Sequence, residues 1–173
     1  EVSDMITFTT GDIFQGEHEV LVNDVNCAGN MDIGAGAVFR EKYPNMFRQY
    51  EKLCGSRIIR PGNTWVYETS RDMPRYIFNA ATQFHWKDRA DLDWVIKCYQ
   101  SIVSQIGGRK VTDIAIPPLG CGAGGLRWKI VRPHAERILD GDSYVKNHCR
   151  VVCSDVSEHF RFEHAPPNVP DAE

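Results

Sequence analysis

Short apolar runs alternate with segments of helical spacing along the whole chain. The short runs are rich in β-branched and aromatic residues and are bounded by turn residues, which is typical of strands. We predict strands at residues 6–10, 20–25, 65–68, 76–79 and 114–116, and a last strand within 145–153. Apolar residues recur at steps of three and four in residues 39–54, 92–106 and 128–139, which predicts helices.

Proline and glycine set the expected helix ends. Pro44 is expected in the first turn of a renewed helix, where its missing N–H costs nothing. Gly107 and Gly108 are expected to end the helix that begins near Leu92, which has the clearest apolar periodicity of the chain. Pro133 is expected within the first turns of the last long helix.

The order of these elements indicates the fold class. Strands and helices alternate without a linker or an internal repeat, which predicts one α/β domain with a mixed sheet between helical layers. We place this domain at residues 1–160 and expect the Pro-rich segment 161–173 to be a loosely ordered tail. In such sheets ligands bind beyond the carboxyl ends of the strands, so the loops that follow strands are the candidate ligand sites.

Composition and charge narrow the class of protein. Hydrophobic residues make up 42% of the chain and charged residues 25%, as in ordinary soluble domains. The net charge of −3 means that any contact with nucleic acid must come from a local patch. No apolar run approaches the roughly 20 residues of a membrane span, and the first residues lack the apolar stretch of a signal peptide. We therefore expect a cytoplasmic protein without membrane contact.

The six cysteines lie mostly within apolar patterns, which is typical of reduced, buried thiols rather than of a disulfide framework. Cys149 and Cys153 lie near His148, but their spacing differs from that of paired zinc ligands. The segment that contains both cysteines has the pattern of a strand. We expect no metal site.

Two glycine-rich loops, residues 26–36 and 120–125, each follow a predicted strand and precede a helix. Small residues let backbone N–H groups approach an anion, and a helix N-terminus favours negative charge, so each loop is a candidate phosphate site. Neither loop carries the Gly-Lys-Ser/Thr sequence of nucleotide-binding loops, and neither is a GxGxxG loop of the dinucleotide fold. A tight turn would explain either loop alone, whereas two such loops in one domain favour an anionic ligand.

Several short sequences resemble those of one family. They are TGDI at residues 10–13, VNDVN at 22–26 and IPPLGCG at 116–122, with a Gly-rich helix start after the second. In this order they resemble a macrodomain over about residues 6–153. The helix residues 39–50 and the stretches PRYIFNAATQFHW and PPLGCGAGGLRW are similar to the DarG-like branch, the DNA ADP-ribosyl glycohydrolase antitoxins. The chain also resembles, more distantly, terminal ADP-ribose protein glycohydrolase. The resemblance implies a three-layer α/β/α fold and ADP-ribose as the ligand, with no cofactor.

The resemblance also implies roles for particular residues. Asp12 would accept a hydrogen bond from the adenine amino group, with Ile13 against the ring, although a turn-forming aspartate explains the sequence equally well. Asn26 would line the distal ribose or, alternatively, cap the strand end, and Thr82 would belong to the pocket wall. The first loop would line the same ribose through Ala28, Gly29, Asn30, Gly34, Ala35 and Gly36. The second loop would wrap the pyrophosphate through Pro118, Leu119, Gly120, Cys121, Gly122, Ala123, Gly124, Gly125 and Leu126. Cys121 is then a small buried residue rather than a nucleophile, since no histidine pairs with it in an evident motif.

The chain departs from the family pattern at two catalytic positions. Where the DarG-like branch carries a catalytic lysine, this chain has Gln83. A lysine can act as nucleophile or proton donor, whereas glutamine can only form hydrogen bonds. The protein glycohydrolase branch uses an aspartate in its phosphate loop, and Gly124 occupies the matching position. Contacts to phosphate and adenine need neither group, so binding of ADP-ribose is still expected.

Asp32 and His85 are candidate replacements for the missing groups. Asp32 would be a general base for water or, as we favour, the cap of the helix that begins near Gly34. His85 would be an acid or base two residues from Gln83 or, as we favour, a packed imidazole beside Trp86.

Lys87 and Arg89 follow directly. They would contact a phosphate of a modified nucleic acid or, as we favour, form a solvated charged turn.

Three functions fit these residues. The first is an ADP-ribosyl hydrolase, in which water attacks the anomeric carbon of the distal ribose, with Asn26, Asp32, Gln83 and His85 as candidate catalytic residues. The second is a binding module that keeps the pocket but not the catalysis, which Gln83 favours. The third is action on a free metabolite such as ADP-ribose phosphate or an O-acyl ester. The expected partners are ADP-ribose or an ADP-ribosylated DNA or protein and, by the resemblance, an ADP-ribosyltransferase toxin. We expect a monomer.

Overall fold

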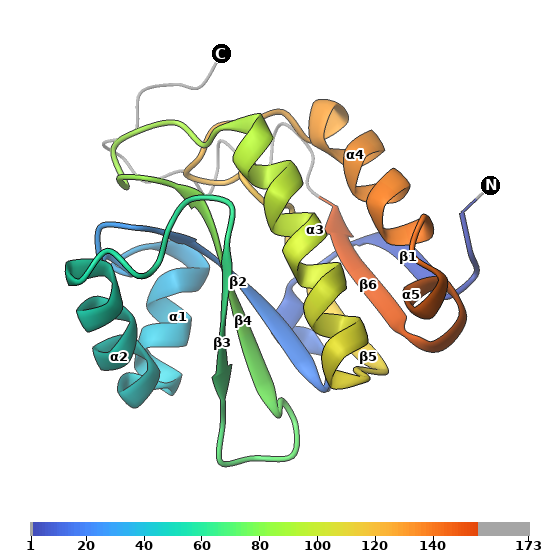
Figure 1. Cartoon of the computed structure of the whole chain (residues 1–173), viewed down its shortest axis with the longest axis horizontal. Helices are drawn as coiled ribbons and strands as arrows, with labels where there is room; N and C mark the ends of the chain where they lie inside the picture. Colours follow the sequence, from blue (N-terminus) through green and yellow to red (C-terminus); the bar gives the residue numbers. More distant parts are fainter. Residues whose placement is uncertain (1, 156–173) are drawn as a thin grey trace.

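The computed structural model describes residues 2–155, which form one six-stranded sheet and the helices around it (Figure 1). The strands are β1 (Ile6–Thr10), β2 (Val20–Asn26), β3 (Thr64–Glu68), β4 (Tyr76–Gln83), β5 (Asp113–Ile116) and β6 (Arg150–Asp155). The helices are η1 (Ile13–Gln15, a 3₁₀ turn), α1 (Gly34–Lys42), α2 (Pro44–Gly55), α3 (Leu92–Arg109), α4 (Trp128–Asp140) and α5 (Ser143–His148). The strand order is β1-β6-β5-β2-β4-β3, and neighbouring strands run parallel except for β3, which is antiparallel to β4.

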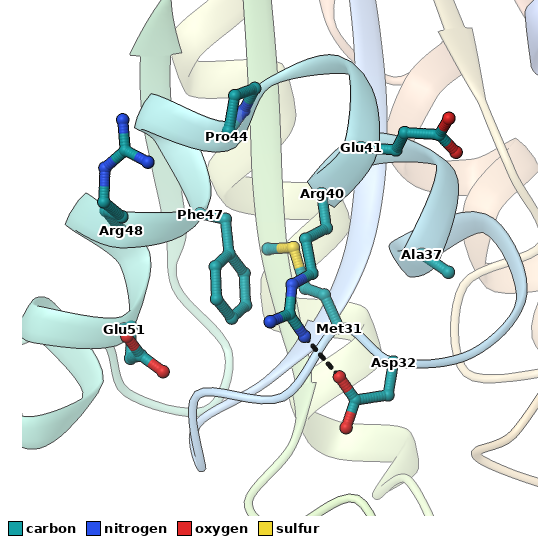
Figure 2. Close-up of a pocket in the computed structure, with 9 residues that line it drawn as sticks. All are labelled: Met31, Asp32, Ala37, Arg40, Glu41, Pro44, Phe47, Arg48 and Glu51. Atoms are coloured by element: carbon teal, nitrogen blue, oxygen red, sulfur yellow. Dashed lines mark hydrogen bonds and ion pairs between the residues drawn. The ribbon is translucent and has the colours of Figure 1, made fainter.

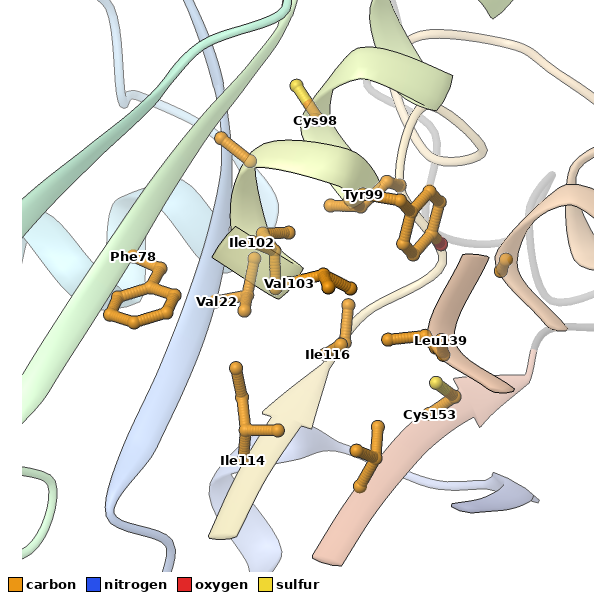
Figure 3. Close-up of a cluster of buried hydrophobic side chains, with 14 of the residues drawn as sticks. Val22, Phe78, Cys98, Tyr99, Ile102, Val103, Ile114, Ile116, Leu139 and Cys153 are labelled. Atoms are coloured by element: carbon orange, nitrogen blue, oxygen red, sulfur yellow. The ribbon is translucent and has the colours of Figure 1, made fainter. Parts of the chain in front are cut away.

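Side chains of β2 alternate between the two faces of the sheet, and each face carries its own apolar cluster. Val20 and Val22 pack in the larger cluster, with α3, α4 and α5. Figure 3 shows its centre, where Ile102 of α3 lies over the sheet. Leu21 and Val25 pack on the opposite face, with α1 and α2. The predicted three-layer α/β/α arrangement with a mixed sheet is therefore confirmed.

The predicted strands and helices are present, but some of their ends differ from the prediction: β4, for example, extends from the predicted 76–79 to Gln83. Pro44 begins α2, as expected. Gly107 and Gly108 do not end α3, because the helix continues to Arg109 and Lys110 adopts the left-handed conformation (φ 54°) that ends it. The last strand begins only at Arg150, because residues 143–148 form α5, whose N-terminus is capped by Asp142. The predicted tail 161–173 lies outside the described residues.

The sheet topology gathers three segments at one edge. Because β5, β2 and β4 are parallel neighbours, their carboxyl ends point the same way. The first Gly-rich loop follows β2, the second follows β5, and Gln83 is the last residue of β4. All six cysteines are free thiols and five of them are buried, as the sequence predicts. Within residues 2–155, the helices are all too short or too polar to cross a membrane.

Candidate functional site

Backbone hydrogen bonds join the two Gly-rich loops to the segment that follows β4. Asn26 lies opposite Gln83 in the pairing of β2 with β4, at an irregularity of the ladder. The amide of Cys27 donates to the carbonyl of Phe84 at 2.9 Å. On the other side, the amide of Ala90 donates to the carbonyl of Gly124, also at 2.9 Å. The segment after β4 therefore bridges the two loops.

Side chains hold the first loop, and Asn26 is central among them. Its Oδ1 accepts from the amide of Ala28 at 2.9 Å and from the hydroxyl of Tyr50 at 3.1 Å. Its Nδ2 donates to the carbonyl of Asn30 at 2.9 Å. Only 6% of Asn26 is exposed, so the side chain shapes the loop that would surround a ribose. Direct contact between Asn26 and a sugar stays a prediction.

Asp32 does not cap α1, so the interpretation favoured from sequence is wrong. The N-cap residue is Ile33, which makes no side-chain hydrogen bond to the helix. Asp32 lies one residue too early and accepts instead from Arg40 Nη1 at 2.5 Å and from Asn30 Nδ2 at 2.8 Å. Gly34 and Ala35, at the start of α1, are exposed, and Gly36 follows them in the first turn. The uncapped amides of this turn are suitable donors to an anionic or hydroxyl-bearing ligand.

The second loop is closed by its own backbone. Its three internal bonds, each 2.9–3.1 Å, are Cys121 N to Pro118 O, Gly125 N to Gly122 O and Leu126 N to Gly120 O. Gly120 has φ +76°, and a Cβ there would lie 2.7 Å from Val95 Cγ2. At Gly122, which is exposed, a Cβ would have no neighbour within 4 Å.

The remaining residues of this loop differ in exposure. Leu119 and Cys121 are fully buried, which agrees with Cys121 as a packing residue. Pro118, Ala123 and Leu126 are half-buried. Their contact with a pyrophosphate stays a prediction.

Asp24 is the residue that the sequence analysis missed. Its Oδ1 accepts from the hydroxyl of Thr82 at 2.5 Å, and its Oδ2 accepts from the amide of Gly120 at 2.8 Å. Burial raises the pKa of this carboxyl to about 6, although both hydrogen bonds act in the opposite direction. This carboxyl thus ties the second loop to the end of β4. An ionisable residue within a buried parallel strand is the signal that would have found it.

Gln83 and His85 are both engaged by their own segment. Gln83 is 6% exposed, and its Nε2 donates to the carbonyl of Asp88 at 2.6 Å. His85 stacks on Trp86 with ring centroids 5.4 Å apart, and its Nδ1 accepts from the amide of Lys87 at 3.1 Å. This geometry agrees with the favoured interpretation of His85 as a packed imidazole.

Asp12 and Ile13 lie where β1 ends. Asp12 Oδ1 accepts from the amide of Phe14 at 2.9 Å and caps η1, which is the turn role considered for it. Ile13 is buried in the cluster beneath α1 and α2, so little of its side chain is left for a ligand. The adenine contact of Asp12 stays a prediction.

An open cavity of about 620 Å³ adjoins the first loop through Met31 and Asp32 (Figure 2). Its other walls are α1 and α2, including the Phe47 ring, with the Arg40 guanidinium 4.1 Å from the ring centroid. Arg40 reaches across the cavity to Asp32, as the dashed line in Figure 2 marks. Among residues 2–155, no three His, Cys, Asp or Glu side chains gather in a way that would hold a metal ion.

Known proteins share both the sequence and the fold. Residues 22–135 match the family described as Macro domain. A DNA ADP-ribosyl glycohydrolase of Mycobacterium tuberculosis is 37% identical over 128 residues, which cover 73% of this chain and 36% of that protein. The chain therefore spans little more than a third of the length of this curated relative.

Two solved structures extend the comparison. The macrodomain of Mycobacterium tuberculosis DarG superposes with a TM-score of 0.81 at 31% identity and covers 88% of this chain and 98% of its own. A Thermosipho africanus DarTG structure in complex with ADP-ribose has a TM-score of 0.79 at 22% identity and covers 89% of this chain and 42% of its own. A protein of the same organism, 24% identical over 150 residues that cover 78% of this chain and 39% of its own, is a DNA ADP-ribosyl transferase–DNA ADP-ribosyl glycohydrolase fusion. With more than half of its length matched by the family and its fold shared, this chain belongs to the macrodomain family.

Proposed function

We propose that this macrodomain binds ADP-ribose attached to a nucleic acid or a protein, at the edge of the sheet where the two Gly-rich loops meet. The observation that carries the proposal is the pair of loops, one at the uncapped start of α1 and one closed by its own backbone around the exposed Gly122. Both offer backbone amides, and two groups of donors suit a ligand with a diphosphate between two sugars. The relatives that act on ADP-ribosylated DNA support the same ligand.

Binding rather than turnover is the main property that we infer. The DarG-like lysine position is occupied by Gln83, whose amide is bonded to the carbonyl of Asp88. A glutamine amide neither attacks a carbon atom nor transfers a proton at neutral pH. We therefore propose a reader that recognises the modification and removes it slowly or not at all.

Hydrolysis is the second candidate, and the position of Asp32 favours it. This carboxylate lies in the first loop, beside the Asn30 that belongs to the Asn26 network. A general base here would take a proton from water as the water oxygen attacks the anomeric carbon of the distal ribose. The bond from that carbon to the modified macromolecule breaks, its carrier atom takes up a proton from solvent, and ADP-ribose is released. The ion pair with Arg40 holds this carboxylate beside the loop. An ADP-ribosyltransferase toxin as functional partner also stays a proposal, supported by the fusion relative.

Calorimetry with free ADP-ribose tests the binding. We expect a dissociation constant in the micromolar range, which corresponds to a binding free energy of about −8 kcal/mol. Absence of heat and of a thermal shift at millimolar ADP-ribose would refute the proposed function.

Incubation with ADP-ribosylated DNA and with ADP-ribosylated protein then separates the two candidates. The reader should release no ADP-ribose from either substrate. If release is observed, Asp32→Ala and His85→Ala identify the base, since loss in Asp32→Ala alone assigns that role to Asp32.

A further inference from the structure

Residues 84–89, between β4 and α3, form an exposed turn whose aromatic and basic side chains the proposed function does not use. We call it the aromatic–basic turn. Phe84 is 61% exposed, which is unusual for a phenylalanine. Lys87 is also exposed, and Trp86 is half-buried. Gln83 directly precedes the turn, so it adjoins the position where the family chemistry would take place.

The side chains of the turn form a layered arrangement. The rings of His85 and Trp86 stack with an interplanar angle of 28°. The Lys87 ammonium lies 5.0 Å from the centroid of the Trp86 ring. The amide of Asp88 donates to the carbonyl of His85 at 3.0 Å, which closes the turn. The turn thus places the exposed Phe84 ring close in sequence to a Lys87 ammonium that lies against the Trp86 ring.

The turn is fixed at both ends to the two Gly-rich loops. At its start, the carbonyl of Phe84 accepts from Cys27 of the first loop at 2.9 Å. At its end, Arg89 Nη2 donates to the carbonyl of Gly125 in the second loop at 3.1 Å. A surface held in this way keeps its position relative to a ligand bound between the loops.

We propose that the aromatic–basic turn is a contact surface for single-stranded nucleic acid, on which bases next to an ADP-ribosylated nucleotide stack. This inference rests on the proposed function and names its substrate class. The exposed Phe84 ring offers a face on which bases of any sequence can stack, and Lys87, beside Trp86, offers a cation for a phosphate. In a duplex the base faces are covered by their neighbours, so a single strand is the matching partner.

Charge also favours nucleic acid over protein at this place. The chain as a whole carries a net charge of −3. Within the turn, the two basic residues Lys87 and Arg89 outnumber the one acidic residue, Asp88. The turn is thus the local basic patch that contact with nucleic acid requires.

Fluorescence anisotropy with a labelled, unmodified single strand of about 12 nucleotides at low ionic strength tests the proposal. Phe84→Ala is expected to weaken binding of the strand about fivefold or more, because it removes a stacking face. Ile58→Ala is the matched control, since Ile58 is equally exposed (61%) but lies outside the turn, and it should bind like the natural protein. Lys87→Glu should weaken binding and reduce its salt dependence by about one phosphate contact, whereas Lys129→Glu on α4 should not.

Calorimetry with free ADP-ribose on the same variants separates this inference from the proposed function. We expect Phe84→Ala and Lys87→Glu to bind free ADP-ribose normally. If the natural protein binds ADP-ribose but not the strand, or if the variants bind the strand as their controls do, the turn is not a nucleic-acid surface. If the variants lose affinity for an ADP-ribosylated peptide rather than for the strand, the surface recognises protein and our inference is overturned. If Phe84→Ala weakens binding of the strand while the natural protein does not bind ADP-ribose, the proposed function is refuted and the turn remains a nucleic-acid surface.

Discussion

The two Gly-rich loops flank the same edge of the sheet but are held in different ways. Side chains organise the first loop, through the network around Asn26 and the ion pair of Asp32 with Arg40. Backbone hydrogen bonds close the second, which packs against Ala90 and Val95 and is tied from outside by the Asp24 carboxylate and the Arg89 guanidinium. The conformation of the first loop therefore depends on its own polar side chains. The conformation of the second depends on its glycines, because a side chain at Gly120 or Gly124 would collide with neighbouring atoms.

This difference extends to electrostatics. The Asp32–Arg40 pair of the first loop is about half exposed on both sides, and such pairs contribute little to stability. The second loop rests on the Asp24 carboxyl, whose pKa is raised to about 6 by burial. The negative charge of Asp24 beneath the second loop thus lowers the stability of the folded state. The Asp32–Arg40 ion pair of the first loop changes that stability little.

Gly120→Ala should have the largest effect on stability. Its Cβ would lie 2.7 Å from Val95 Cγ2 and 3.0 Å from Leu126 Cδ1, and its φ of +76° is unfavourable for alanine. Crowding and backbone strain together should lower the free energy of unfolding by about 3 kcal/mol, measured by urea denaturation. Gly34→Ala in the first loop is the control: its φ is +57° but no atom lies within 4 Å of a Cβ. There we expect only the strain, about 1 kcal/mol. Equal losses in the two variants would contradict the contrast between the loops.

Asp24→Asn should stabilise the protein at neutral pH. The folded-state pKa of about 6 lies above the unfolded value of 3.8, so the folded state binds the proton more tightly. This group therefore makes the free energy of unfolding fall as pH rises from about 4 to about 6, and the deficit persists above pH 6. The neighbouring Cys98 and Tyr99 have pKa values raised by burial, so they stay neutral in this range.

Asparagine removes the charge and still offers an oxygen to the Gly120 amide and an N–H to Thr82. We expect a gain of about 2 kcal/mol at pH 7.5, below the ~3 kcal/mol of two full pKa units because Asp24 is partly exposed, and a smaller gain at pH 5. ADP-ribose should also bind more tightly at pH 7.5, since one negative charge near the phosphate loop is lost. Asp142→Asn, which alters the cap of α5, controls for the loss of any single carboxylate. A destabilised Asp24→Asn at pH 7.5 would mean that the charge itself holds the loop.

Gly122→Val should weaken ADP-ribose binding about tenfold or more, with the fold intact. A Cβ at Gly122 would enter open space on the exposed side of the loop, where a phosphate is expected. Calorimetry measures the affinity, and circular dichroism verifies the fold. Gly124→Val is no substitute, because its Cβ would lie 2.7 Å from the carbonyl oxygen of Gly120 and would distort the loop itself. Normal affinity in folded Gly122→Val would remove the second loop from the phosphate site.

The strands, the long helices and the two loops were predictable because each depends on local spacing of apolar residues or glycines. Asp24 was not, because its partner Gly120 lies 96 residues away and only the sheet brings them together. The predicted end of α3 was wrong because burial of the helix outweighed the low helix propensity of glycine. Ile106 is fully buried, and the helix continues past both glycines. The predicted cap role of Asp32 was wrong because aspartate is a common N-cap residue, but this side chain pairs with Arg40, eight positions further on.

Gln83→Lys should have the smallest effect, a partial gain of turnover on ADP-ribosylated thymidine in DNA. The resemblance to the DarG-like branch implies a lysine at this position, and both loops are hydrogen-bonded to the segment that follows it. The gain is limited because Gln83 is almost fully buried and bonded to the carbonyl of Asp88, an acceptor that would also attract a lysine ammonium and draw it away from the sugar. Since positioning of a reacting group is worth several kcal/mol, an amine held in this way would recover only part of the rate.

Release of ADP-ribose from a modified single strand is the measurement, and Gln83→Met, which has similar length but no amine, is the control. If Gln83→Lys releases no more than Gln83→Met while both variants bind ADP-ribose normally, the catalytic centre of this macrodomain lies elsewhere, and Asp32 becomes the residue to test.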